Sequence, residues 1–144
     1  MLERTDWAHL IPHAGGMCLL DTVLAWDATH IHAISDSHAD EAHPLRSPQG
    51  LHAVHLSEYG AQAMAVHGAL AARARGDEGV RQGRLVSLRD VMLAVTYVDA
   101  RGGCLDVHAE QLFADEGGAQ YAFRVVQAGR ELASGRAAVI YVAG

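Results

Sequence analysis

The stretch Ala53–Arg75, which reads AVHLSEYGAQAMAVHGALAARAR, decides the fold. It contains no proline, it is rich in alanine, and Gly76 follows at the point where a helix would end. Apolar residues occur on nearly every side of the helix that this stretch predicts, which is typical of a buried helix. Many of the side chains are small, so neighbouring elements can pack close to it. The sequence therefore predicts one long central helix.

Short segments separated by turn residues flank this helix. A short opening turn is expected at Thr5–Leu10. The expected extended segments are Asp21–Trp26, His30–Ser35, Arg84–Val98, Cys104–Phe113, Gln120–Gln127 and Glu131–Val142. Short turns rich in glycine and aspartate separate the last four, so we expect them to form an antiparallel meander. The order predicts an α+β fold of one domain over residues 1–144, in which a single sheet wraps around one helix.

Composition excludes several classes of function. The chain has 144 residues, is 50% hydrophobic and carries a formal net charge of −6, which is typical of a globular domain and argues against a nucleic-acid partner. All 11 basic residues are arginine, so Schiff-base chemistry and a P-loop lysine are excluded. No apolar run approaches the length of a membrane helix, and no signal peptide is recognisable. Two cysteines without a C-x-x-C motif favour a reduced, cytoplasmic protein.

Glu58 is the sharpest candidate for chemistry. It lies early in a helix that is otherwise nearly all apolar, and the only other polar group on its face is Gln62, one turn later. A buried carboxyl raises its pKa, and a carboxyl that is protonated near neutral pH can act as a general acid. The alternative is that the start of the helix is exposed and that Glu58 only complements the helix dipole.

Histidine is unusually frequent, with 10 residues in the chain. His13 lies between Pro12 and the Gly15-Gly16 pair, where the backbone is tightly positioned, and a histidine is the natural general base at neutral pH. The alternative is an ordinary loop histidine. We expect the histidines outside the candidate sites to be surface or packing residues. These are His9, His38, His43, His67 and His108.

A metal site and a basic docking site are two further possibilities. His52, His55 and Glu58 are spaced three residues apart, and His30 and His32 share a strand face. Three-residue steps turn successive side chains away from one another on a helix, so we expect no metal site here. We expect no other cofactor either. Four arginines cluster in an otherwise acidic chain and predict either a docking site for an acidic partner or a solvated helix end. They are Arg73, Arg75, Arg81 and Arg84.

Two motifs of this chain resemble a known family. Residues 10–21, LIPHAGGMCLLD, resemble the LPHR-x-P-M-LLLD opening of hot-dog-fold 3-hydroxyacyl-(acyl carrier protein) dehydratases. Residues 58–63, EYGAQA, resemble their E-x-x-AQ helix motif. The resemblance is closest to the dehydratase-like proteins of aryl-polyene pigment pathways. It implies a hot-dog fold, in which one long helix is wrapped by an antiparallel sheet, and a dimer formed by pairing of sheet edges.

The resemblance also implies roles for particular residues at a dimer interface. His13 would remove the C2 proton of a carrier-bound 3-hydroxyacyl thioester, and Glu58 of the other subunit would protonate the departing hydroxyl. Gln62 would orient Glu58. The thioester carbonyl would be polarised by backbone N–H groups near the start of the helix. The candidates for these groups are Gly50, Leu51, Ala53 and Val54.

The implied partners are an acyl carrier protein, whose substrate hangs on phosphopantetheine, and a second hot-dog subunit in a homodimer or heterodimer. The chain departs from housekeeping members before the helix, where their HFPGxPxxPG stretch is replaced by HPLRSPQG at residues 43–50. Two alternatives stay open. One is a hot-dog thioesterase in which Glu58 activates water, and the other is a non-catalytic, acyl-binding subunit of a heterodimer.

Overall fold

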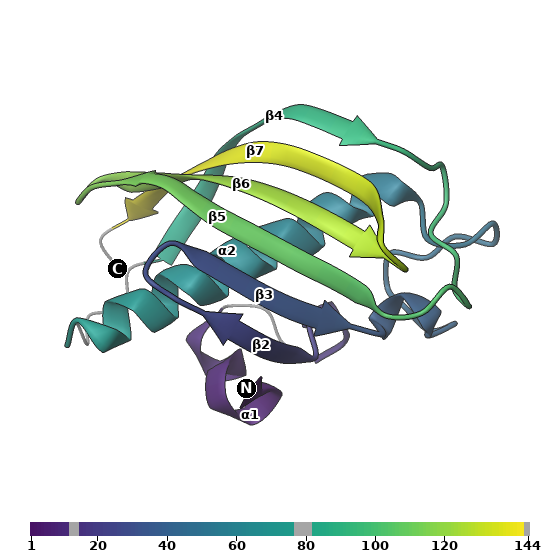
Figure 1. Ribbon diagram of the computed structural model, residues 1–144, viewed down its shortest axis with the longest axis horizontal. Helices are drawn as coiled ribbons and strands as arrows, with labels where there is room; N and C mark the ends of the chain where they lie inside the picture. The colour runs from purple at the N-terminus through teal and green to yellow at the C-terminus, as the bar shows by residue number, and fades with distance from the viewer. Residues whose placement is uncertain (12–14, 77–81, 143–144) are drawn as a thin grey trace.

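The computed structural model describes residues 1–11, 15–76 and 82–142, and in these ranges a seven-stranded antiparallel sheet curves around one long helix (Figure 1). The elements are β1 (Leu2–Glu3), α1 (Arg4–Trp7), β2 (Thr22–Trp26), β3 (His30–Ser35), α2 (Leu56–Ala74), β4 (Gln82–Leu93), β5 (Leu105–Ala114), β6 (Gly118–Gln127) and β7 (Arg130–Val142). Within the described ranges, no helix combines the length and the apolarity needed to cross a membrane.

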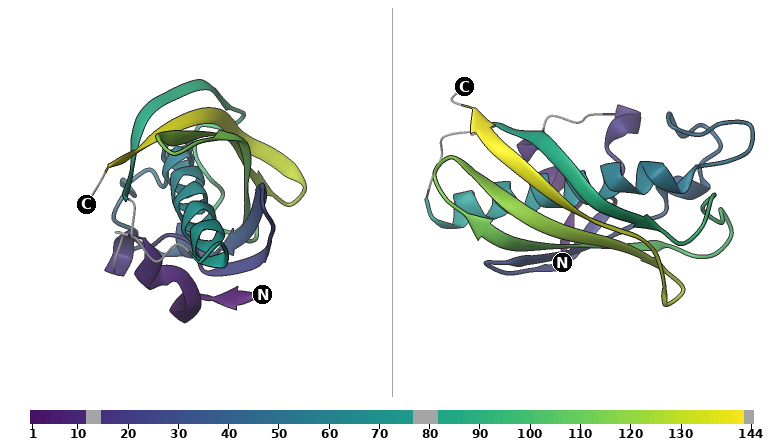
Figure 2. Two further views of the ribbon diagram at one scale, coloured as in Figure 1. Left: turned by 90° about the vertical axis from the view of Figure 1, so that its left-hand side faces the viewer. Right: turned by 90° about the horizontal axis from the view of Figure 1, so that it is seen from above.

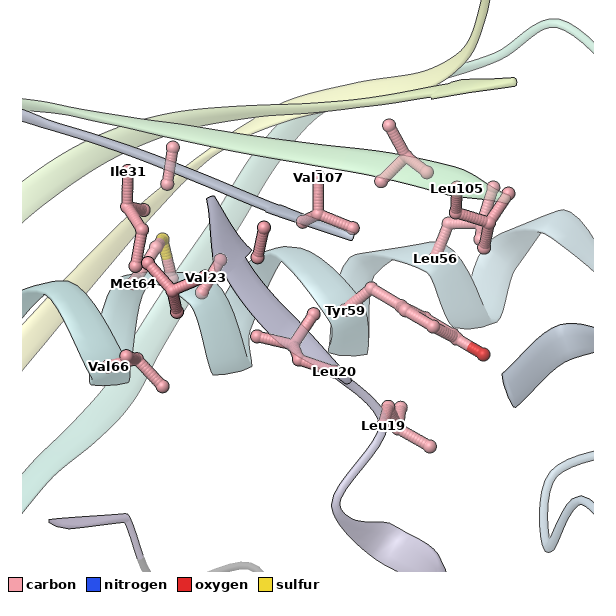
Figure 3. Close-up of a cluster of buried hydrophobic side chains, with 14 of the residues drawn as sticks. Leu19, Leu20, Val23, Ile31, Leu56, Tyr59, Met64, Val66, Leu105 and Val107 are labelled. Carbon is pink, nitrogen blue, oxygen red and sulfur yellow. The ribbon is translucent and has the colours of Figure 1, made fainter. Parts of the chain in front are cut away.

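Helix α2 occupies the centre of the molecule, which confirms the expectation from Ala53–Arg75. A short 3₁₀ turn, Ala53–His55, leads into it. Seen end-on, the helix lies inside the curve of the sheet (Figure 2). Its apolar side chains pack against inward-facing residues of β2, β3 and β5 (Figure 3). The labelled core residues are Leu19, Leu20, Val23, Ile31, Leu56, Tyr59, Met64, Val66, Leu105 and Val107.

The strands after the helix form a sheet, but the predicted meander is wrong at its first member. The strand order is β1-β2-β3-β5-β6-β7-β4, so β4 pairs with β7 at one end of the sheet and not with β5. The predicted strand Arg84–Val98 also ends early, at Leu93. Its last residues leave the sheet and bond to the segment before α2. The Ala53 N–H donates to Thr96 O, and the Val98 N–H donates to Leu51 O.

Close contact between α2 and the sheet requires glycine at one position of the EYGAQA motif. A Cβ atom on Gly60 would lie 2.6 Å from the ring of Phe123 on β6, which is closer than real contacts allow. Gly68, two turns later on the same helix, has only the Tyr121 hydroxyl at 3.8 Å and the Tyr141 hydroxyl at 4.0 Å as neighbours. The two helical glycines therefore differ in the space around them.

We expect Gly60→Ala to destabilise the protein by about 1–3 kcal/mol, because the added methyl group overpacks the core against Phe123. Gly68→Ala is the matched control, and it should stabilise the protein by up to about 1 kcal/mol through helix propensity. Urea denaturation of both variants measures the difference. A stabilised Gly60→Ala protein would contradict the close packing.

Several histidines belong to the core, as expected for packing residues. His38, His43 and His67 are buried. His67 accepts a hydrogen bond from the Tyr121 hydroxyl through Nδ1 (2.7 Å) and donates through Nε2 to Asp27 O (2.9 Å). This assignment follows because a carbonyl oxygen can only accept, which places the imidazole proton on Nε2. Buried neutral histidines thus account for part of the unusual histidine content.

The stability of the fold should therefore fall in mild acid. Burial lowers the pKa values of His38, His43 and His67 below the usual 6.5 and, with neighbouring cationic groups, lowers the pKa of His108 to about 4. Between about pH 6.5 and 4 the unfolded chain binds more protons than the folded one, so the free energy of unfolding decreases as the pH is lowered through this window. Each such histidine contributes a slope of up to about 1.4 kcal/mol per pH unit.

Urea denaturation at pH 7.5 and at pH 5.5 tests this expectation. The midpoint of the transition should lie at a lower urea concentration at pH 5.5. His108→Thr should make the pH dependence shallower, because it removes one of the titrating groups. Equal midpoints at the two pH values would refute the prediction.

Candidate active site

Helix α2 places Glu58 and Gln62 on the same side, one turn apart. Glu58 lies in the first turn of the helix and is half-buried, so neither the fully buried nor the fully exposed alternative holds. Gln62 is completely buried. A carboxyl in this position can meet a ligand and also lies near the positive end of the helix dipole.

Gln62 connects the two motifs that carry the family resemblance. Its Oε1 atom accepts a hydrogen bond from the Leu19 N–H (2.8 Å), and its Nε2 atom donates to Met17 O (2.6 Å). These bonds hold Met17 and Leu19, in the second half of the LIPHAGGMCLLD motif, against α2, one helical turn after Glu58. His13 lies outside the described residues. The role of Gln62 in orienting Glu58 stays a prediction, and the structure adds a second role, as an anchor for the segment that follows His13.

Most of the backbone N–H groups that were candidates for binding the thioester carbonyl already donate within the chain. The bonds run from Gly50 N–H to Ser47 O (2.9 Å), from Ala53 N–H to Thr96 O (2.8 Å) and from Val54 N–H to His52 Nδ1 (3.0 Å). In this arrangement these three groups are not open to a substrate. Leu51 is the remaining candidate, and its N–H makes no hydrogen bond to another described residue.

A hydrogen-bonded series of buried and partly buried hydroxyl groups starts at Tyr59, the residue that follows Glu58, and the sequence did not indicate it. The Tyr59 hydroxyl bonds to Ser37 Oγ (2.6 Å) and to His43 Nε2 (3.0 Å). Ser37 Oγ bonds to Ser35 Oγ (2.9 Å), and Ser35 Oγ donates to Leu19 O. Burial raises the pKa of Tyr59 to about 12 and lowers the pKa of His43, so both are neutral at pH 7. The only local signal in the sequence was a tyrosine beside Glu58.

Two histidines of the metal hypothesis, His52 and His32, have other partners. His52 caps the 3₁₀ turn through Nδ1. His32 Nε2 lies 2.7 Å from Asp106 Oδ1, and its ring stacks on that of His108 at 4.2 Å between centroids. In the described part of the chain, no group of three metal-ligating side chains lies together.

The arginine cluster lies away from Glu58. Arg73 and Arg75 are exposed at the end of α2, and Arg84 is exposed on β4, whereas Arg81 lies outside the described residues. Fifteen residues of helix separate Glu58 from Arg73, which is about 22 Å along the axis. A partner bound at the arginines would have to reach Glu58 with an extended arm.

A set of exposed apolar side chains lies on and just after β4, at one end of the sheet, and at the start of α2. We call it the β4 surface, and it consists of Val54, Leu85, Val86, Leu88, Val91, Met92, Leu93 and Tyr97, each more than a third exposed. The most exposed is Met92, at 71%. Large apolar patches of this kind mark interaction sites, and an edge strand is a template for pairing with another chain.

Two hollows on the surface of the single chain lie elsewhere. One is beside His30, His32 and His108 on β3 and β5, and the other lies between α1 and the end of α2. Neither is lined by Glu58 or Gln62.

Comparisons with known proteins agree with these features. A protein-family model described as ApeP-like, ApeP dehydratase, matches residues 5–143. The dehydratase heterocomplex ApeI:P from Xenorhabdus doucetiae has a TM-score of 0.82 and 24% identity, covering 94% of this chain and 90% of that chain. No curated protein matches the chain.

Two further solved structures are similar at lower scores. AziG from S. sahachiroi has a TM-score of 0.61 and 21% identity, covering 89% of this chain and 94% of that chain. A putative thioesterase from Ralstonia eutropha JMP134 has a TM-score of 0.61 and 15% identity, covering 83% of each chain. At these identities the solved structures establish a common fold and nothing more.

Proposed function

The chain belongs to the ApeP-like dehydratase family, and we propose that it removes water from a 3-hydroxyacyl thioester carried by an acyl carrier protein. The family match confirms the resemblance to hot-dog dehydratases of the aryl-polyene branch, and the helix wrapped by a sheet is the hot-dog fold. The observation that carries the proposal is the pair of hydrogen bonds between the Gln62 side chain and the backbone of Met17 and Leu19, because it connects the two family motifs within the fold.

The proposed reaction is an elimination by an acid and a base. His13 takes the C2 proton of the thioester, the C3–O bond breaks as the C2–C3 double bond forms, and Glu58 of the other subunit gives its proton to the departing hydroxyl at the dimer interface. The products are the trans-2-enoyl thioester and one water. In the proposed assignment Leu51 polarises the thioester carbonyl, since its N–H makes no bond to another described residue. No cofactor is needed, because the step involves no net oxidation or reduction.

A second hot-dog subunit is the proposed partner at the β4 surface. The ApeI:P structure is a heterocomplex, and pairing along β4 would extend the sheet across two chains. Because the β4 surface reaches Val54 and Tyr97 next to the start of α2, a subunit bound there would also wall the site at Glu58. The carrier protein is the proposed occupant of the exposed arginines at the other end of α2.

The test is an assay of water loss by mass spectrometry. The purified protein, with any subunit that co-purifies, is incubated with saturated and polyunsaturated 3-hydroxyacyl carrier-protein thioesters. Conversion to a product lighter by one water supports the proposal. Release of a free acyl chain would replace it with the thioesterase alternative. Intact thioesters throughout would leave this chain as a non-catalytic subunit.

A further inference from the structure

We propose that Tyr59 is a positioning residue of the dehydratase site, acting through the hydrogen-bonded chain His43, Tyr59, Ser37, Ser35 and Leu19. The proposal rests on the proposed function, because it concerns the same site. None of these side chains is assigned contact with substrate. Their task is to hold the segment Met17–Leu20 in one position relative to the first turns of α2.

The direction of every hydrogen bond in the chain follows from its two ends. The Leu45 N–H donates to His43 Nδ1 (3.0 Å), so that nitrogen carries no proton and His43 Nε2–H donates to the Tyr59 oxygen. At the other end, Leu19 O can only accept, so the Ser35 hydroxyl donates to it and the Ser37 hydroxyl donates to Ser35 Oγ. The proton between Tyr59 and Ser37 therefore comes from the Tyr59 hydroxyl, which donates to Ser37 Oγ. Reversing any one bond would leave a buried donor facing a donor.

The far end of the chain reaches the segment that Gln62 also holds. Ser37 Oγ donates to Ser35 Oγ, which donates in turn to Leu19 O. The Leu19 N–H donates to Gln62 Oε1. Leu19 is therefore held by both of its backbone polar groups, through Ser35 on one side and through Gln62 of α2 on the other.

Tyr59 also determines how the first turns of α2 are seated. Its ring is fully buried in the apolar cluster, and its hydroxyl lies at the edge of that cluster (Figure 3). Tyr59 is adjacent to Glu58 in the helix, so the two bonds at its hydroxyl limit rotation of the turn that carries the carboxyl. One hydroxyl thus links the position of the turn that carries Glu58 to the position of Leu19.

The protein contains a matched control for the Tyr59 hydroxyl. Tyr121 is a second buried tyrosine whose hydroxyl bonds to a buried histidine, His67, in the middle of α2. Tyr59→Phe and Tyr121→Phe remove the same atom from equally buried sites. A merely structural role would give both variants similar stability losses and similar kinetics.

We expect Tyr59→Phe to lower kcat for dehydration by about 10- to 100-fold while KM changes by less than about twofold. Tyr121→Phe should leave kcat within about twofold of the wild type. Ser37→Ala removes the next hydroxyl in the hydrogen-bonded series and should lower kcat by a similar factor. It serves as the second variant if Tyr59→Phe does not fold. An unchanged kcat in Tyr59→Phe or in Ser37→Ala would overturn the proposal, as would equal losses in Tyr59→Phe and Tyr121→Phe.

Amide hydrogen exchange at Leu19 separates this proposal from the proposed function. Its N–H should exchange at least about tenfold faster in Tyr59→Phe than in the wild type, and at the wild-type rate in Tyr121→Phe. If the wild type removes no water from any thioester, the proposed function fails. The exchange rate at Leu19 then decides by itself whether the hydrogen bonds from His43 to Leu19 hold the segment Met17–Leu20 in place. Equal exchange at Leu19 in all three proteins would overturn the positioning role.

Discussion

Replacing Glu58 with glutamine is expected to lower the rate of dehydration by about 10²–10⁴-fold, the usual contribution of a general acid. Glutamine has nearly the shape of glutamate, and it cannot give a proton to the departing hydroxyl. Because Glu58 is half-buried in the first turn of α2, the exchange should leave the melting temperature within a few degrees of the wild type. The effect should therefore be one on chemistry and not on folding.

The measurement is the mass-spectrometric assay of water loss, with His13→Ala and Glu110→Gln beside it. His13→Ala should be similarly impaired, because the elimination needs both a base and an acid. Glu110 is an exposed carboxylate on β5, so Glu110→Gln should behave as the wild type. Full activity of Glu58→Gln in an active complex would show that Glu58 of this chain is not the acid.

Charging the β4 surface should separate this chain from its partner subunit. In the single chain, Val86 is 55% exposed and Met92 is 71% exposed. A lysine buried in an interface without a partner costs about 3–5 kcal/mol, so Val86→Lys with Met92→Lys should raise Kd by at least about 10²-fold. If the partner closes the site at Glu58 as proposed, the double variant should also lose dehydratase activity.

Native mass spectrometry of the tagged chain, purified from its source organism, identifies the partner and measures its loss. Phe113→Lys is the matched control, since Phe113 is 57% exposed and lies on β5, outside the β4 surface. Wild-type protein should be a homodimer or a heterodimer, and the double variant a monomer. If the double variant keeps its partner while Phe113→Lys loses it, the interface lies on the other side of the sheet.

The sequence was sufficient for the central helix and for most strands, because these depend on neighbouring residues. The Ala-rich stretch before Gly76 predicted α2 to within a few residues, and the alternation at His30–Ser35 predicted β3. Two motifs likewise indicated the family, since each is a contiguous run of residues. The placement of β4 could not be found in this way. It depends on pairing with β7, some 50 residues later, and on bonds from the segment after β4 to Leu51 and Ala53.

The same distinction between local and distant residues applies to the candidate site. Sequence alone selected Glu58 and Gln62, because an acid and an amide one turn apart on an apolar helix are visible in the spacing. Only the tertiary structure showed that Gln62 bonds to Met17 and Leu19. It also showed that three of the candidate backbone N–H groups already donate hydrogen bonds within the protein. The connection from Tyr59 to Leu19 through two serines was likewise visible only in the structure. Helical and strand periodicity is written into local residue order, whereas a hydrogen bond between distant residues exists only once the chain has folded and brought them within about 3 Å.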